Sequence, residues 1–314
     1  MPIRALIAEP ADFSPEAIRI LQTVSEVELR DCPREDLPNA FAQYDIVWFR
    51  LAHPITDAVL GEDPRCRILA TAVTGLAHID LEACARRNVR VISLKGETEF
   101  LKEVPATAEL TLAITLALLR HIPAAAASVQ AGEWNRDAFR GSELSGKSVG
   151  LVGVGRLGTL VAGYFQAFGC RVLGFDPRPD FPHGVARQMA SLDDLLRESD
   201  IVSVHVEFNP STRGLIGARE LRSMRRGAIV VNTARGGVLD EKALLESLES
   251  EHLGGAALDV LEAEPDIAPN HPLVEFARRS PRLLIVPHIG GNTAESFAKT
   301  EEFLARKIVQ ALSA

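Results

Sequence analysis

An arginine, a glutamate and a histidine follow three predicted strands in the second half of the chain, as Arg235, Glu264 and His288. A guanidinium binds a carboxylate through two parallel hydrogen bonds. A histidine exchanges a proton with a hydroxyl or carbonyl oxygen, and a nearby carboxylate raises its proton affinity. Taken singly, each also fits an ordinary role, as a surface arginine, a solvated loop acid or a structural histidine. Because α/β sheets place ligands at the carboxyl ends of their strands, the three together indicate a site for a small acid that gains or loses a proton.

A glycine-rich turn upstream of these residues has the spacing of a dinucleotide site. Gly153, Gly155 and Gly158 stand between the predicted strand 149–152 and a helical segment at 159–168. The first glycine permits the tight turn, the second lets a pyrophosphate approach the backbone, and the third lets helix and strand pack closely. The beginning of the helix offers free N–H groups to the phosphates. The turn therefore predicts a bound dinucleotide rather than a merely structural loop.

The residue expected to contact the ribose is Asp176, which ends the next predicted strand, 171–175. Its carboxylate can accept hydrogen bonds from the two ribose hydroxyls of NAD, and it would repel the 2′-phosphate of NADP. Arg178 complicates this interpretation, because a guanidinium at that position can also bind a phosphate. We predict NAD as the cofactor. Beside NAD, the arginine, glutamate and histidine are the groups that hydride transfer on a 2-hydroxy or 2-oxo acid requires.

The elements that must position these residues alternate between strand and helix patterns, which predicts the α/β class with two doubly wound parallel sheets. The predicted strands are Ile3–Ala8, Glu26–Arg30, Ile46–Phe49, Ile68–Thr71, Val89–Ser93, Val149–Val152, Arg171–Phe175, Ile201–Val204, Ile229–Asn232, Gly255–Leu258 and Leu283–Val286. The predicted helices are Pro15–Thr23, Asp57–Leu60, Leu81–Arg86, Ala106–Arg120, Thr159–Phe168, Leu192–Glu198, Ala218–Ser223, Glu241–Glu249 and Thr293–Leu312. Residues 95–104 lack periodicity and are predicted as a loop.

Composition narrows the class of protein. A length of 314 residues favours two domains, and a formal net charge of −8 argues against nucleic acid as a partner. The four cysteines have neither a CxxC pair nor metal-ligand spacing, so we expect reduced structural thiols and no metal site. The chain starts directly with a strand pattern and lacks a charged-then-apolar leader, and its longest apolar stretch, 110–119, is too short to span a bilayer. These features predict a soluble, cytoplasmic protein that does not bind membranes.

Five stretches resemble the D-isomer-specific 2-hydroxyacid dehydrogenases, in the branch of phosphoglycerate dehydrogenases and hydroxypyruvate reductases. They are VGLVGVGRLG, SVHVEFNPSTRGLIG, VVNTARGGVLDE, GAALDVLEAEP with HPL after it, and VPHIGGNT. The resemblance makes Arg235 the arginine for the substrate carboxylate, His288 the general acid/base and Glu264 its partner. It implies a flavodoxin-like substrate domain, residues 1–98 plus 290–314, with an inserted NAD-binding Rossmann domain, residues 99–289. It also implies a homodimer built around the coenzyme domains and the Ala106–Arg120 region.

The resemblance further implies the residues that contact coenzyme and substrate. The coenzyme residues are Gly153, Gly155, Arg156, Leu157, Gly158, Asp176, His205, Thr212, Thr233, Ala234, Asp259 and Gly290. Backbone amides of Thr74, Gly75 and Leu76 would bind the substrate carboxylate, although Val73 and Ala77 depart from the family pattern around them. Arg50 occupies the place of a phosphate-binding arginine, and Thr71 that of a second basic residue. The loop Lys95–Lys102 is long enough to cover the substrate. Phosphoglycerate, hydroxypyruvate and glyoxylate all stay open as substrates.

A different function is also found with this fold. Some proteins that have it are NAD-sensing transcriptional corepressors, and they keep the same arginine, glutamate and histidine. The lack of an added peptide-binding or disordered tail favours an enzyme. Formate dehydrogenases also resemble the family but carry an amide at the place of Glu264, having no proton to transfer. The sequence therefore predicts an oxidoreductase that moves a hydride between NAD(H) and a small D-2-hydroxy or 2-oxo acid.

Overall fold

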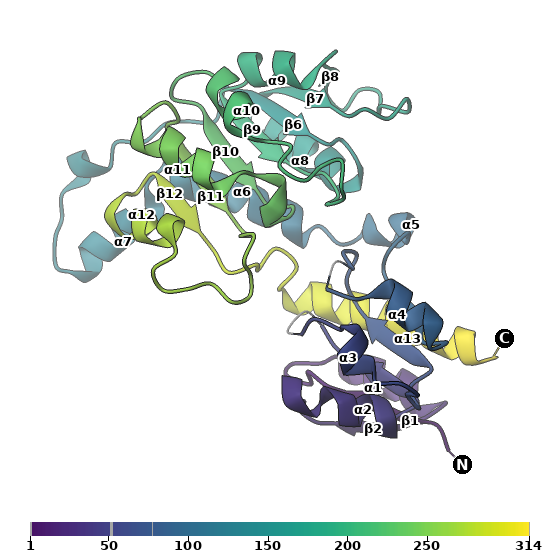
Figure 1. Cartoon of the computed structure of the whole chain (residues 1–314). Coiled ribbons are helices and arrows are strands. Elements are labelled where there is room, and N and C mark those ends of the chain that lie inside the picture. The colour runs from purple at the N-terminus through teal and green to yellow at the C-terminus, as the bar shows by residue number, and fades with distance from the viewer. Residues whose placement is uncertain (1, 51–52, 77, 314) are drawn as a thin grey trace. The chain divides into compact units, whose positions relative to one another are not determined.

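The chain divides into two compact units, and the computed structural model describes residues 2–50, 53–76 and 78–313. The first unit contains residues 1–104 and 292–314, and the second contains residues 105–291. The second unit is thus an insertion in the sequence of the first (Figure 1).

The first unit is built on a five-stranded parallel sheet in the order β2-β1-β3-β4-β5, which is the flavodoxin-like order. Its strands are β1 Arg4–Ile7, β2 Glu26–Leu29, β3 Ile46–Trp48, β4 Ile68–Thr71 and β5 Arg90–Ser93. Its α-helices are α1 Pro15–Gln22, α2 Leu37–Gln43, α3 Asp57–Leu60, α4 Leu81–Arg86, α5 Thr98–Leu101 and α13 Ala294–Ser313.

Helices cover both faces of this sheet because successive strand residues point to opposite sides. Leu6, Val47 and Leu69 pack in one core with side chains of α2, α3 and α4. Their neighbours Ile7, Trp48 and others pack in a second core with α1 and the C-terminal helix α13. The yellow C-terminal helix therefore lies against the purple first helix of the chain (Figure 1).

The second unit is built on a seven-stranded parallel sheet in the order β12-β11-β10-β9-β6-β7-β8. Its strands are β6 Ser148–Val152, β7 Arg171–Phe175, β8 Arg187–Gln188, β9 Ile201–Val204, β10 Ile229–Asn232, β11 Gly255–Leu258 and β12 Leu283–Ile285. Its α-helices are α6 Ala106–Leu119, α7 Ile122–Gln130, α8 Arg156–Ala167, α9 Leu192–Glu198, α10 Ala218–Ser223, α11 Glu241–Glu249 and α12 Pro272–Arg279. Counted from β8, the order matches the doubly wound Rossmann arrangement, with the direction of winding reversing between β6 and β9.

The predicted α/β class with two doubly wound parallel sheets is confirmed. Three helices, α2, α7 and α12, were not predicted, and the segment predicted as a loop at 95–104 contains the single turn α5. Helix α7 begins directly after the predicted helix Ala106–Arg120, and Pro123 lies in its first turn, where proline is well tolerated. All four cysteines are free and buried, as expected of structural thiols.

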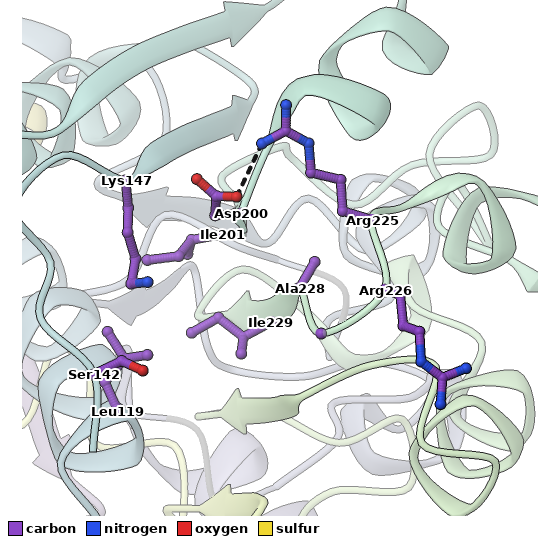
Figure 2. Close-up of a pocket in the computed structure, with 10 residues that line it drawn as sticks. Leu119, Ser142, Lys147, Asp200, Ile201, Arg225, Arg226, Ala228 and Ile229 are labelled. Carbon is purple, nitrogen blue, oxygen red and sulfur yellow. Dashed lines mark hydrogen bonds and ion pairs between the residues drawn. The ribbon is translucent and has the colours of Figure 1, made fainter. Parts of the chain in front are cut away.

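A pocket lies at the amino-terminal edge of the seven-stranded sheet, and Figure 2 shows Lys147, Asp200 and Arg225 among the residues that line it. Arg225 Nη1 donates to Asp200 Oδ1 over 2.9 Å. Since α/β sheets bind ligands at the opposite, carboxyl edge, this pocket is not the coenzyme site.

Among the described residues, no single helix is long and apolar enough to cross a membrane. One bent pair of helical segments, Thr98–Leu119 with Ile122–Gln130, has the length and the apolar composition of a membrane span when the two are taken together.

Candidate active site

The glycine turn between β6 and α8 has the shape that a pyrophosphate needs. Gly153 has a φ of +93°, and a Cβ atom there would lie 2.7 Å from the carbonyl oxygen of His205. A Cβ atom on Gly158 would collide with the carbonyl oxygen of Gly153, so the close approach of helix and turn requires glycine. Gly155 is the N-cap residue of the twelve-residue α8, and a Cβ atom there would lie 3.8 Å from Arg178 Nη2. The turn and the helix N-terminus therefore fit a dinucleotide phosphate.

Asp176 lies directly after β7, beside this turn. Its Oδ2 accepts the N–H of Val154 over 2.9 Å, and Arg178 donates to its two oxygens over 2.9 and 3.0 Å. Burial alone would raise the pKa of this carboxyl, but the hydrogen bonds from Arg178 and Val154 outweigh burial and hold the pKa below its usual range. Arg178 thus points toward Asp176 and keeps it ionised, which the sequence did not reveal.

The next strands bring the other predicted coenzyme residues to the same edge of the sheet. His205 follows β9, and burial lowers the pKa of its ring to about 3, so the ring is neutral at physiological pH. Its Nε2 and the Ser203 hydroxyl are 2.8 Å apart. Thr233 follows β10, and its hydroxyl lies 2.8 Å from that of Thr111 on α6. Thr212 belongs to the loop after His205, where its hydroxyl donates to the carbonyl of Glu207 over 2.7 Å.

Arg235 lies in the turn after β10, where Asn232 fixes the backbone. The Asn232 side chain accepts from Ala234 N–H and donates to the carbonyl oxygen of Arg235, each over 3.0 Å. Burial lowers the pKa of the Arg235 guanidinium, while the carboxylates of Glu264 and Asp259 oppose that shift. A partly buried guanidinium in this turn can form two parallel hydrogen bonds with a carboxylate. Asn232 was missed by sequence reasoning, although a polar residue closing an apolar strand was a usable signal.

His288 and Glu264 form the central pair of the site. His288 Nδ1 lies 2.9 Å from Glu264 Oε1, and the side chains keep 29% and 26% exposure. Nδ1 can carry the proton shared with the carboxylate, which leaves Nε2 for a substrate oxygen. His288 adopts a φ of +52°, in the left-handed region that a non-glycine residue seldom occupies. The structure therefore brings the two predicted residues together, and their catalytic role stays a prediction.

Asp259, at the end of β11, holds the backbone around His288. Its carboxylate accepts the N–H groups of Ile289 and Gly290 over 2.7 and 2.9 Å, and its carbonyl oxygen accepts the His288 N–H over 2.8 Å. The side chain is almost fully buried, and burial raises the pKa of its carboxyl despite these bonds. The observed contacts make Asp259 a positioning residue for His288, and its predicted contact with the coenzyme stays a prediction.

The predicted substrate residues of the first unit follow two neighbouring strands. The loop Thr74–Leu76 follows β4 and is anchored by two backbone hydrogen bonds, from Leu94 N–H to Val73 and from Ile79 N–H to Leu76. Arg50 follows β3, and its guanidinium contacts Glu301 of α13. Ala77 lies outside the described residues. The role of these residues in binding substrate stays a prediction.

The fold and the site define a dinucleotide-binding protein whose Rossmann unit is inserted in a flavodoxin-like unit. Residues 112–290 match the family described as D-isomer specific 2-hydroxyacid dehydrogenase, NAD binding domain. The chain therefore belongs to the D-isomer-specific 2-hydroxyacid dehydrogenase family, and its second unit contains the NAD-binding domain. The predicted family and the predicted cofactor, NAD, are confirmed.

Known relatives of similar sequence differ in their named substrates. The chain is 34% identical to a hydroxypyruvate reductase of Thermotoga maritima over 98% of both chains. It is 33% identical to a D-3-phosphoglycerate dehydrogenase of Methanocaldococcus jannaschii over 99% of this chain, but it spans only 57% of that relative. Among solved structures, D-lactate dehydrogenase of Aquifex aeolicus with NAD and lactic acid is 26% identical, with a TM-score of 0.83 over 99% of this chain and 95% of that one.

Proposed function

We propose that this protein is an NAD-dependent oxidoreductase that interconverts a small D-2-hydroxy acid and its 2-oxo acid. The observation that carries the proposal is the His288–Glu264 pair at 2.9 Å, close to the Arg235 cation in an NAD-binding domain. An acid/base pair beside a carboxylate-binding cation matches the needs of a 2-oxo acid, whose carbonyl oxygen takes up a proton during reduction.

Each side chain has a distinct part in this reaction. Bound NADH supplies the hydride that reduces the carbonyl carbon. His288 donates its Nε2 proton to the carbonyl oxygen, and Glu264 stabilises the imidazolium through Nδ1. Arg235 binds the 2-carboxylate and orients the carbonyl group toward the histidine. In the oxidation direction, His288 accepts the hydroxyl proton by the same contact.

An assay of the wild-type protein with a panel of acids tests this function. We expect NADH oxidation with at least one of glyoxylate, hydroxypyruvate, pyruvate, 2-oxoglutarate or a branched 2-oxo acid, or NAD reduction with 3-phosphoglycerate. The measurement is kcat/KM from NADH absorbance, together with NADH affinity from fluorescence. If the protein binds NADH but turns over none of these acids, the proposed enzymatic function is wrong, and the NAD-sensing function is the alternative.

Coenzyme choice gives a second expected result. The wild type should show a higher kcat/KM with NADH than with NADPH, because the ionised Asp176 favours a ribose diol over a phosphate. Asp176→Ala should lower kcat/KM for NADH by at least about tenfold, as expected for the loss of a charge-assisted hydrogen bond. It also releases Arg178, so activity with NADPH should fall less or rise. Asp137→Ala removes an exposed carboxylate elsewhere in the same unit and should leave the NADH to NADPH ratio unchanged. A wild-type ratio at or below one would disprove the role of Asp176.

The assembly predicted from the sequence, a homodimer, belongs to the same proposal. Helix α7 buries none of its own residues, and it exposes Ile122 and Val129, with Trp134 just beyond it 88% exposed. Apolar side chains gathered on one exposed helix favour a partner surface. Sedimentation velocity should give twice the chain mass of 34.0 kDa, and a monomer at micromolar concentration would refute the dimer. The cytoplasmic location stays a prediction.

A further inference from the structure

A buried ion pair in the first unit joins Arg50 to Glu301 of α13. Arg50 Nη2 and Nε donate to Glu301 Oε1 over 2.8 and 3.2 Å. The other oxygen of Glu301 accepts the N–H of Ser14 over 2.8 Å, and the Glu301 side chain is only 1% exposed. Three donors therefore hold this carboxylate in one position inside the unit.

The Arg50 guanidinium is fixed from its other sides as well. Its Nη1 donates to the carbonyl oxygen of Ala11 over 2.9 Å, and its central carbon lies 4.2 Å from the ring centre of Phe297. Three of the five N–H donors of this arginine are thus used within the unit. Turning the guanidinium toward another anion would leave Glu301 as an unpaired buried carboxylate, which is strongly unfavourable.

The pair lies at the edge of the sheet where a substrate is expected. Arg50 follows β3 and the loop Thr74–Leu76 follows the neighbouring strand β4, and the Thr71 hydroxyl donates to the carbonyl oxygen of Arg50 over 3.2 Å. Both segments therefore lie at the carboxyl edge, where α/β sheets bind ligands.

Two lysines near the same edge are paired too. Lys102 contacts Glu99 over 2.7 Å, and Lys307 of α13 contacts Glu97 over 2.6 Å. The two glutamates lie in the segment that follows β5. The carboxylate that balances the charge of Arg50 is Glu301. A second anionic group on a substrate would therefore meet an Arg50 guanidinium that is already paired.

We propose that Glu301 determines substrate specificity by neutralising Arg50, so that the enzyme favours small 2-oxo acids with a single anionic group over those with an added phosphate. The inference rests on the proposed function and narrows its substrate class. Hydroxypyruvate and 3-phosphohydroxypyruvate form a matched pair for testing it, because they differ only by the phosphate group.

The experiment measures kcat/KM for both acids with saturating NADH. The wild type should favour hydroxypyruvate, and Glu301→Gln should raise the ratio of phosphorylated to unphosphorylated activity by at least about tenfold, the order expected for one hydrogen bond between charged groups. The double variant Glu301→Gln with Arg50→Gln should lose this gain, because no free cation remains. Glu302→Gln, which removes a carboxylate paired with Arg306 on the same helix, should leave the ratio at its wild-type value.

Each outcome decides the proposal. If Glu301 only fastens α13 to the sheet, Glu301→Gln lowers the melting temperature and changes activity on both acids equally, which would overturn the specificity role. A wild type that prefers 3-phosphohydroxypyruvate would also overturn it while leaving the proposed oxidoreductase intact, and this comparison needs no variant to fold. A wild type that reduces no 2-oxo acid of the panel would refute the proposed function itself.

Discussion

Replacing His288 with glutamine is expected to lower kcat by about 10²- to 10⁴-fold, the usual contribution of a general acid or base. Glutamine can occupy a similar volume and keep a hydrogen bond to Glu264, but it cannot deliver a proton to the substrate oxygen. The affinity for NADH should be nearly unchanged, because the glycine turn and Asp176, the proposed coenzyme contacts, follow other strands of the sheet. Steady-state kinetics and NADH fluorescence measure the two quantities.

The matched control for this variant is His252→Gln. His252 precedes β11 at the amino edge of the sheet, and its Nε2 lies 3.1 Å from the carbonyl oxygen of Leu221, a contact that glutamine can reproduce. This control should keep wild-type kcat. If His288→Gln retains half of the wild-type kcat, the proton donor is another group.

Arg235→Lys is expected to lower kcat/KM on 2-oxo acids by roughly 10- to 100-fold. A lysine keeps the positive charge but cannot form the two parallel hydrogen bonds of a guanidinium with a carboxylate, and a hydrogen bond to a charged group contributes about 1.5–3 kcal/mol. The loss should depend on the substrate carboxylate, so a neutral 2-oxo amide, poor with the wild type, should lose much less.

Arg225→Lys serves as the control, because Arg225 pairs with Asp200 beside the pocket at the amino edge of the sheet (Figure 2). It changes the same residue type without approaching the catalytic pair. Equal kcat/KM for wild type and Arg235→Lys would place the carboxylate site elsewhere.

The fold was largely predictable because most of its elements leave a local pattern in the sequence. Buried parallel strands read as short apolar runs, and nearly all were predicted within one or two residues of their observed bounds. The short β8, Arg187–Gln188, has exposed residues and no such run. Helix α7 has many alanines and buries none of its residues, so it lacks the amphipathic period that marks a packed helix.

The positions of the candidate site residues were predictable where they follow strands, as for the glycine turn, Arg235, Glu264 and His288. Their roles stay predictions. Side-chain orientation was not predictable, because it depends on contacts between distant residues. Arg178 points toward Asp176 across the end of β7, and Asp259 holds the His288 segment about thirty residues away. Arg50 contacts Glu301, 251 residues later in the chain, and no local pattern links the two.

The proposed reaction is direct, D-specific hydride transfer from the coenzyme to the carbonyl carbon of a 2-oxo acid. It can be followed by incubating the wild type with NADH deuterated at both C4 positions and its best 2-oxo acid, and by analysing the product by mass spectrometry and chiral chromatography. We expect a D-2-hydroxy acid with one deuterium bound to C2. A product without deuterium at C2, or an L-2-hydroxy acid, would contradict it.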